Sequence, residues 1–552
     1  MNTITEQLLA AEFFTDLKER KRLIDEIELL CEKVYSETID VCFWGYENFS
    51  VEKLESILKD LQEKTKTEKF LNVTLEKTEL NTEENQSNYA ALKEQVLSQF
   101  AQHRNDTGTE LIVQQILSSN HIYTTRSDEK TELFIYHEGI YIPQGKSFVK
   151  EFVREILQEA FTTYRCNNVI AKIEADTFIN SEDLFSLDNV EEIAVENGVL
   201  NIFTRELSQF TPNKFFFNKL PVKYDPNKDC PIIKKHLEEV LRFGEDIKVM
   251  QELFGFCLLR EYRIEKAFML IGTGRNGKSK TIELMKRFIG IENCVNIPLQ
   301  QLEIDNFALS ELHNKMANLA GDIDDTTLKK TGNFKTLTGR DLISASKKFL
   351  PRVKFTNYAK LIFLANKLPR VYDMSEGFWN RWILLEFPYS FFSEKELNER
   401  IEEENCKLAD PDIIEKLTTE KELSGLLNWS LDGLERLLKQ KDFSYSKSTA
   451  ETKEAWIRKS DSFRAFLMDC IEEEYGHDIE KQVLKRSYAE YCKKHKIEMV
   501  SDKSIKYTLT TNFAVTDKQK WISFSEDADP YSKEKGKRIY IWEGIKFKEN
   551  AW

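Results

Sequence analysis

The stretch Lys266-Ala-Phe-Met-Leu-Ile-Gly-Thr-Gly-Arg-Asn-Gly-Lys-Ser279 decides the fold class expected for this chain. Its apolar run from Ala267 to Ile271 is typical of a buried strand. The next eight residues, Gly272 to Ser279, match the pattern G-x-x-x-x-G-K-[ST] without a mismatch. An amphipathic helix is predicted to follow, with an apolar stripe formed by Ile282, Met285, Phe288 and Ile289.

A strand, a glycine-rich loop and a helix in this order make a binding site for the phosphates of a nucleoside triphosphate. Glycines let backbone N–H groups surround the phosphates, and the helix N-terminus adds its dipole. Lys278 would neutralise phosphate charge and Ser279 would ligate Mg²⁺. A chance glycine-rich turn would not explain the flanking strand and helix. The predicted nucleotide-binding residues are Gly272, Thr273, Gly274, Arg275, Asn276, Gly277, Lys278, Ser279 and Lys280.

Length and composition limit the class of protein. A chain of 552 residues should hold about three or four domains, and a hydrophobic content of 41% is enough for packed cores. An uninterrupted run of about 18 apolar residues is missing, so no transmembrane helix is expected. The first residues lack the features of a signal peptide. Nine scattered cysteines without a C-x-x-C pair suit a reducing cytoplasm and argue against a zinc site.

The net charge of −14 conceals an uneven distribution. Residues 1–100 carry 12 basic and 21 acidic side chains, whereas residues 481–552 carry 16 basic and 10 acidic ones. Nucleic-acid binding needs a local basic surface rather than a basic chain. The basic C-terminal part is therefore the candidate DNA-binding region.

A second apolar segment, Lys315 to Ala320, is expected to be a strand that ends in carboxylates. A nucleotide hydrolase with a phosphate loop needs one acidic side chain for the Mg²⁺ shell and a neighbour that polarises the attacking water. Asp322 directly follows the strand and is predicted to hold the metal. Asp324 or Asp325 would then act on the water, and the sequence leaves that choice open.

Three further candidates follow in order along the chain. Asn366 ends the apolar run Ala359–Ala365, where an amide can sense the γ-phosphate and orient water. Arg381 precedes another apolar run and could reach a neighbouring subunit's nucleotide. Lys347 and Lys348 lie at the tip of a segment from Leu337 onward that is expected to form two short strands and a turn. Solvated lysines would explain such a tip equally simply, but paired lysines can also grip a phosphate backbone.

These segments resemble the superfamily 3 helicase domain of the phage and plasmid primase-helicase family. The resemblance rests on four motifs: GTGRNGKS from Gly272, LTGRDLISA from Leu337, IFLANKLPR from Ile362 and FWNRWI from Phe378. It implies a hexameric AAA+ ring that hydrolyses ATP with Mg²⁺ and moves along single-stranded DNA, usually 3′ to 5′.

The resemblance also implies a role for each matching residue. Lys278 and Ser279 fall on the phosphate loop, Asp322 and Asp324 on the acidic motif, and Asn366 on the sensor. Lys347 and Lys348 fall on the DNA loop of the central channel, and Arg381 on a finger that acts in the next subunit. Members of the family often carry an N-terminal polymerase domain, and this chain is expected to lack one.

Four regions are predicted: an acidic helical part (1–110), an α+β module (111–228), the helicase domain (229–443) and a winged helix (450–552). Within the last, helices at Lys459–Glu474, Gln482–His495 and Ser501–Asn512 would precede strands at Trp521–Phe524 and Arg538–Trp542. Such a module binds DNA through a recognition helix and a wing, although wings also make protein contacts. The predicted DNA-contacting residues are Lys503, Lys506, Lys535, Lys537 and Arg538.

The expected function is therefore that of an ATP-dependent DNA helicase in the replication of a phage, plasmid or integrated element. Its expected partners are forked and single-stranded DNA, further copies of the chain, and a primase or an origin-binding protein. Two alternatives stay open: a helicase-primase with an unrecognised N-terminal polymerase, and an origin-binding scaffold that uses ATP only to assemble. A small-molecule kinase would explain the phosphate loop but leave Asn366, Arg381 and the basic C-terminal part without a role.

Overall fold

The computed structural model describes residues 83–127, 130–186, 190–321, 326–348, 352–399, 405–495, 497–513, 515–523 and 536–549. The chain divides into two compact units, and the described part of the first comprises residues 83–116 and 149–169. The second holds residues 117–148 and everything from 170 onward. The helices predicted before residue 83 lie outside the described residues.

Helices dominate the first unit. It contains α3 (Glu83–Ala101) and parts of α4 (Asn105–Ser119), α5 (Gly145–Leu157) and α6 (Thr163–Asp176). Its core is made by fully buried aliphatic side chains spaced three or four residues apart, as an amphipathic helix requires: Val96, Ile112, Val113, Ile116, Val149, Val153 and Ile156.

Two small sheets precede the main domain in the second unit. The first has the order β3-β2-β1-β4, and the second has the order β5-β6-β7. The predicted hairpins around Gly139 and Asn197-Gly198 are both confirmed, because β2 pairs with β3 and β5 with β6 in antiparallel fashion. The strands are β1 (Ile122–Thr125), β2 (Leu133–His137), β3 (Ile140–Ile142), β4 (Phe178–Ile179), β5 (Glu192–Val195), β6 (Gly198–Asn201) and β7 (Leu207–Ser208). The short helices η2 (Gln158–Ala160) and α7 (Ser181–Leu184) lie between them in sequence.

A five-stranded parallel sheet is the centre of the second unit. Its order is β14-β8-β13-β10-β9, and every neighbouring pair is parallel. The strands are β8 (Ala267–Ile271), β9 (Cys294–Val295), β10 (Ala317–Ala320), β13 (Lys360–Ala365) and β14 (Trp382–Glu386). A mixed α/β fold with a parallel sheet is thereby confirmed. All five residues of β8 are buried, as a strand covered on both faces requires.

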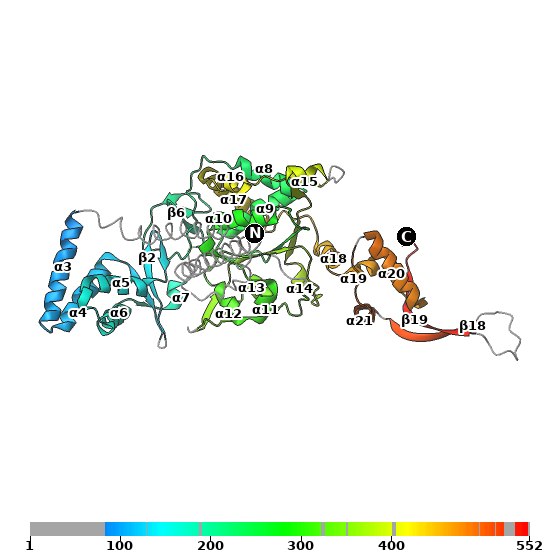
Figure 1. Cartoon of the computed structure of the whole chain (residues 1–552), viewed down its shortest axis with the longest axis horizontal. Helices are drawn as coiled ribbons and strands as arrows, with labels where there is room; N and C mark the ends of the chain where they lie inside the picture. The colour runs from blue at the N-terminus through cyan, green and yellow to red at the C-terminus, as the bar shows by residue number, and fades with distance from the viewer. Residues whose placement is uncertain are drawn as a thin grey trace, which may run out of the picture. The chain divides into compact units, whose positions relative to one another are not determined.

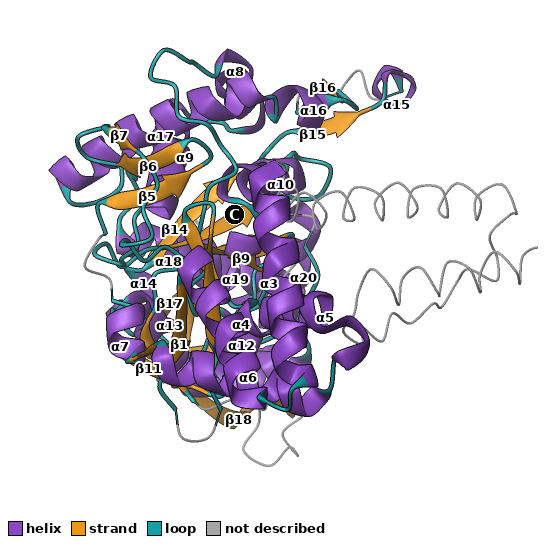
Figure 2. Cartoon of the chain, turned by 90° about the vertical axis from the view of Figure 1, so that its left-hand side faces the viewer, coloured by secondary structure: helices purple, strands orange, loops and turns teal. Residues whose placement is uncertain are grey.

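Helices cover the two faces of this sheet separately, as Figures 1 and 2 show. Phe268 and Leu270 of β8 belong to a core formed with α8, α9, α10 and α17. Ala267, Met269 and Ile271 point to the other face, where they join a core formed with α11 to α14. The alternation of side chains along a strand thus produces a three-layer sandwich.

The helices over the first face are α8 (Pro231–Val240), α9 (Gly244–Leu258), α10 (Lys278–Ile289), α16 (Ile413–Leu417) and α17 (Glu420–Gln440). Those over the second are α11 (Leu299–Ile304), α12 (Asn306–Glu311), α13 (Gly332–Thr338) and α14 (Glu376–Trp379). Smaller elements join them: η3 (Ile291–Asn293), β11 (Leu342–Ala345), β12 (Val353–Thr356), β15 (Ser390–Phe392), α15 (Glu394–Asn398) and β16 (Cys406–Leu408).

The C-terminal part has its own core and its own antiparallel sheet. Helix α18 (Thr449–Ser460) leads into α19 (Ser462–Cys470), β17 (Ile471–Glu480), α20 (Lys481–His495), α21 (Asp502–Asn512), β18 (Thr516–Ser523) and β19 (Gly536–Phe547). The sheet order is β17-β19-β18. Phe466, Tyr488, Leu509 and Trp542 are buried together between the helices and this sheet.

Two predicted elements are wrong. The helix expected at Lys459–Glu474 is interrupted at Asp461, whose side chain caps the start of α19, and β17 begins at Ile471. The segment expected to be strand from Leu337 is still helical at Leu337 and Thr338, where α13 ends. The strand pair β11–β12 does form, beyond that helix.

Candidate nucleotide-binding site

The loop between β8 and α10 has the backbone that a phosphate-binding loop needs. Gly274 and Gly277 have φ values of 110° and 85°, and Arg275 has a φ of 50°. Left-handed residues next to right-handed ones turn successive backbone N–H groups toward a common point, which suits an anion. A Cβ at Gly277 would lie 2.6 Å from Val240 Cγ1, so only glycine fits there.

The structure brings Lys278 and Asn366 together. Lys278 Nζ donates to Asn366 Oδ1 at 3.0 Å, to Asn276 Oδ1 at 3.0 Å and to the Gly272 carbonyl at 2.7 Å. The residues of this contact are 88 positions apart in sequence. They meet because β8 and β13 are adjacent and parallel, so that both carboxyl ends lie at one edge of the sheet. Ser279 and Lys280 are exposed at the start of α10.

The side chain of Arg275 is held by α15. Its Nη1 lies 2.7 Å from Glu396 Oε1, and its carbonyl accepts a hydrogen bond from the Phe391 N–H. Hydrogen bonds from Arg275 and then Ser393 lower the pKa of Glu396 to about 2. The carboxylate is therefore ionised at neutral pH and fixes one side of the loop.

The acidic candidates Asp322, Asp324 and Asp325 lie outside the described residues. The strand before them is described, and its register places it at the same edge: Ala320 of β10 pairs with Phe363 of β13, which precedes Ala365 and Asn366. Gly321, the described residue that follows β10, thus lies at the edge of the sheet where the glycine-rich loop and Asn366 are found. A Mg²⁺ ion would find Ser279 on the α10 side of that edge.

Arg381 lies at the opposite edge of the sheet. Its carbonyl accepts a hydrogen bond from Ala267 N–H, at the first residue of β8, whereas the phosphate loop follows the last. Its guanidinium is 14% exposed and contacts Glu265 Oε2 at 2.6 Å, Thr338 Oγ1 at 2.9 Å and the Gly377 carbonyl. A strand of five residues spans about 16 Å, so Arg381 lies at the far end of β8 from the glycine-rich loop of its own chain. Glu265 and Thr338 were not predicted, because nothing in their spacing marks them as its partners.

The two predicted channel lysines differ in their surroundings. Lys347 follows β11, is 24% exposed and forms an ion pair with Glu132 at 3.3 Å. Lys348 is exposed beside it. The contact with Glu132 could not be predicted from a sequence pattern, because the two residues are 215 positions apart. Lys347 would have to leave that carboxylate to bind a phosphate.

The basic candidates of the C-terminal part are spread over a helix and a strand. Lys503 and Lys506 are exposed on α21, and Lys506 forms an ion pair with Asp517 at 3.2 Å. Lys537 and Arg538 are exposed at the start of β19. Lys535 lies outside the described residues.

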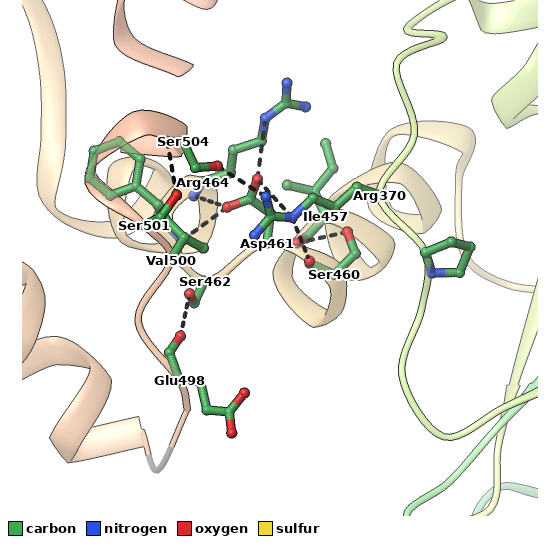
Figure 3. A network of polar contacts seen from close by, with 12 residues as sticks. Arg370, Ile457, Ser460, Asp461, Ser462, Arg464, Glu498, Val500, Ser501 and Ser504 are labelled. Carbon is green, nitrogen blue, oxygen red and sulfur yellow. Dashed lines mark hydrogen bonds and ion pairs between the residues drawn. The ribbon is translucent and has the colours of Figure 1, made fainter. Parts of the chain in front are cut away.

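A polar network links the segment after Asn366 to the C-terminal helices (Figure 3). Arg370 Nε lies 3.6 Å from Asp461 Oδ2, and Arg370 Nη1 donates to Ser504 Oγ at 3.0 Å. Asp461 also accepts from the N–H groups of Phe463 and Arg464 at the start of α19. Arg370 and Asp461 together therefore join the loop after β13, helix α19 and helix α21.

Comparisons with known proteins relate the chain to two protein families and to viral proteins. The family described as "D5 N terminal like" matches residues 31–242, and a family of unknown function, DUF5906, matches residues 270–381. "Putative helicase V13" of Sputnik virophage is 27% identical over 282 residues, or 48% of this chain. "Putative helicase L207/L206" of Acanthamoeba polyphaga mimivirus is 27% identical over 265 residues, or 45% of this chain. These matches support a superfamily 3 helicase-like protein of the phage and viral type.

The helicase-like chain spans only 35% and 28% of the length of these two relatives. A solved structure titled "The A form apo structure of NrS-1 C terminal region-CTR" covers 78% of this chain and is itself covered to 98%, at 13% identity and a TM-score of 0.42. At this TM-score and identity, the resemblance supports no conclusion about the function of this chain. In the part of the chain that the structure describes, every helix is too short or too polar to cross a membrane.

Proposed function

We propose that this chain is an ATP-dependent DNA helicase that works as a hexameric ring in the replication of a phage, plasmid or integrated element. The observation that carries the proposal is the meeting of Lys278 and Asn366 at one sheet edge, with Arg381 at the other edge. One chain then supplies Lys278 for phosphate binding and Asn366 as the sensor, and the neighbouring chain supplies Arg381.

The parallel sheet supports a P-loop core of AAA+ type. Strand β13 lies between the phosphate-loop strand β8 and the strand β10 that leads to the acidic residues. Asn366 at its end would stand between the loop and Asp322, where it can orient water. Lys278 would hold ATP phosphates, and Ser279 with Asp322 would hold Mg²⁺, which supplies charge neutralisation when bound. Asp324 or Asp325 would polarise the water.

In a closed ring, every Arg381 would meet the nucleotide site of the neighbouring subunit. Contacts between two different faces of one subunit generate rings when the rotation closes. Lys347 and Lys348 on the β11–β12 hairpin would move with the nucleotide state and carry one DNA strand, in the 3′ to 5′ direction. The C-terminal part would act as a winged helix, with α21 and the β18–β19 hairpin placing Lys503, Lys506, Lys535, Lys537 and Arg538 near phosphates.

Strand displacement on forked DNA with either a 3′ or a 5′ overhang tests the proposal. The chain should release the labelled strand with ATP from the fork with a 3′ overhang, and Lys278→Ala should release none. Mass determination with ATP should give six copies. If ATP is hydrolysed but neither fork is opened, the chain is an assembly scaffold instead. Primer synthesis on a single-stranded template would establish the helicase-primase alternative.

A further inference from the structure

One face of the β18–β19 hairpin carries exposed aromatic side chains. Trp521 pairs with Arg538 across the two strands, and Gln519 pairs with Tyr540. Paired residues of an antiparallel ladder point to the same side, and alternate residues of a strand share a face. Trp521, Arg538 and Tyr540 therefore lie on one face, where Trp521 is 53% and Tyr540 55% exposed. Figure 1 shows the hairpin extending past α20 and α21.

The same face changes from core to surface along the hairpin. Trp542, the next residue of β19 on this face, is buried in the core with Tyr488 and Leu509. Lys481 marks the boundary, because its Nζ lies 4.2 Å from the Trp542 ring centroid and 5.7 Å from that of Tyr540. Beyond it the helices no longer cover the sheet. The exposed aromatic rings thus lie on a two-stranded extension of a folded core.

The charge on this face favours an anionic ligand. Asp517 is on the same face, and its carboxylate is paired with both Lys481 and Lys506, which lower its pKa. Arg538 is exposed on the same face. On the opposite face, Lys518 and Lys520 are each paired with a carboxylate, at 2.5 Å to Glu543 and 2.7 Å to Asp478. Lys537 is also exposed on that opposite face, because it pairs with Ile522. The aromatic face combines the three cations Arg538, Lys481 and Lys506 with one carboxylate, Asp517.

We propose that Trp521 and Tyr540 form a stacking platform for unpaired DNA bases, with Arg538 between them and Lys481 and Lys506 facing the phosphates. Rings that are half exposed and interleaved with a guanidinium match the chemistry of single-strand binding. Bases in a duplex are already stacked on each other and offer their faces only at ends and forks. The platform rests on the proposed function, and it would hold the strand that a helicase has just separated.

The test compares single-stranded and duplex DNA on the full chain. Anisotropy of a fluorescein-labelled oligothymidylate and of a blunt duplex is measured with Trp521→Ala, Tyr540→Ala and Trp521→Phe. Each alanine variant should lose roughly five- to 150-fold in affinity for the single strand, the range for one lost stacked base. Duplex affinity and ATP hydrolysis without DNA should stay within about twofold, because phosphate contacts and the nucleotide site are untouched. Trp521→Phe should keep most of the affinity.

Tyr475→Ala is the matched control, since Tyr475 is a fully exposed tyrosine on β17 of the same sheet. It should leave both affinities unchanged and give the same thermal unfolding midpoint as the other variants. An equal loss on single strand and duplex would overturn the platform in favour of a general phosphate contact. An unchanged single-strand affinity would overturn it in favour of a protein-binding face. If the unaltered chain bound neither DNA, the helicase proposal itself would fail.

Discussion

At Lys278, three oxygens from three places in the chain converge on one ammonium group. The Gly272 carbonyl and Asn276 belong to the loop itself, whereas Asn366 comes from the end of β13. The lysine is only 3% exposed, so its position is fixed by these acceptors rather than by solvent. Replacing Asn366 therefore alters the surroundings of Lys278 as well as those of the water that Asn366 would orient.

Glu265 forms an ion pair with Arg381, and in the proposed shared site it would act as a positioning residue. The ion pair at 2.6 Å joins a half-exposed carboxylate to a mostly covered guanidinium. Such a pair contributes about 1 kcal/mol. Glu265→Gln should therefore lower the kcat for ATP hydrolysis roughly five- to tenfold with an unchanged KM, since ATP binding does not involve it.

The matched control for this change is Glu261→Gln, which removes a nearby carboxylate whose partner is Arg263. It should hydrolyse ATP at the unaltered rate. A raised KM in Glu265→Gln, or equal effects of the two substitutions, would mean that Glu265 does not act through Arg381.

At the scale of single elements, the Asp461 carboxylate has two structural roles at the start of helix α19. Asp461 caps the helix and also lies beside Arg370, which bonds to α21 through Ser504. Losing a cap costs about 1 kcal/mol, and removing the carboxylate beside the Arg370 guanidinium adds a similar amount. Asp461→Ala should therefore lower the free energy of urea unfolding of the C-terminal part by about 2 kcal/mol.

Ser448→Ala isolates the cap alone, because Ser448 caps α18 through a capping box with Glu451. Its expected cost is about 1 kcal/mol. If the two substitutions destabilise equally, Arg370 contributes nothing to holding α19 and α21 in place.

The predicted elements were those with a strong local signal. The strand, loop and helix from β8 to α10 follow from an apolar run, glycines and an amphipathic stripe in that order. The two hairpins follow from Gly139 and Asn197-Gly198 between apolar runs. Strand β17 was missed because Ile471–Glu480 is acidic and mostly exposed, so its pairing with β19 comes from tertiary contacts. The contacts of Arg381 with Glu265 and of Lys347 with Glu132 could not be predicted, since both join residues more than 100 positions apart. The roles of the site residues remain predictions.

At the scale of the whole molecule, a buried histidine makes stability depend on pH. His236 of α8 is 6% exposed, and burial lowers its pKa to about 4. Its folded pKa is below the unfolded value of about 6.5, so the unfolded state binds more protons between these values. Stability is then lost as the pH falls below about 6.5. At about pH 5 the loss from His236 amounts to about 2 kcal/mol.

His236→Leu should remove this part of the acid sensitivity. Urea unfolding at neutral pH and at about pH 5 should show a drop smaller by about 2 kcal/mol than in the unaltered chain. His477→Leu replaces an exposed histidine and should leave the drop unchanged. A drop of the same size in His236→Leu would show that His236 is protonated without cost in the folded state.

The central claim is that each nucleotide site is shared between two copies of the chain, with Lys278 from one and Arg381 from the next. The most direct measurement is ATP hydrolysis by Lys278→Ala and Arg381→Ala, first separately and then mixed in equal amounts. Each variant alone should be inactive, although Arg381→Ala should still bind ATP. In a random mixture, about a quarter of the interfaces would combine an intact Lys278 with an intact Arg381, so the mixture should recover about a quarter of the unaltered rate. A mixture as inactive as its components, or an Arg381→Ala variant that hydrolyses ATP at the full rate, would contradict the shared site.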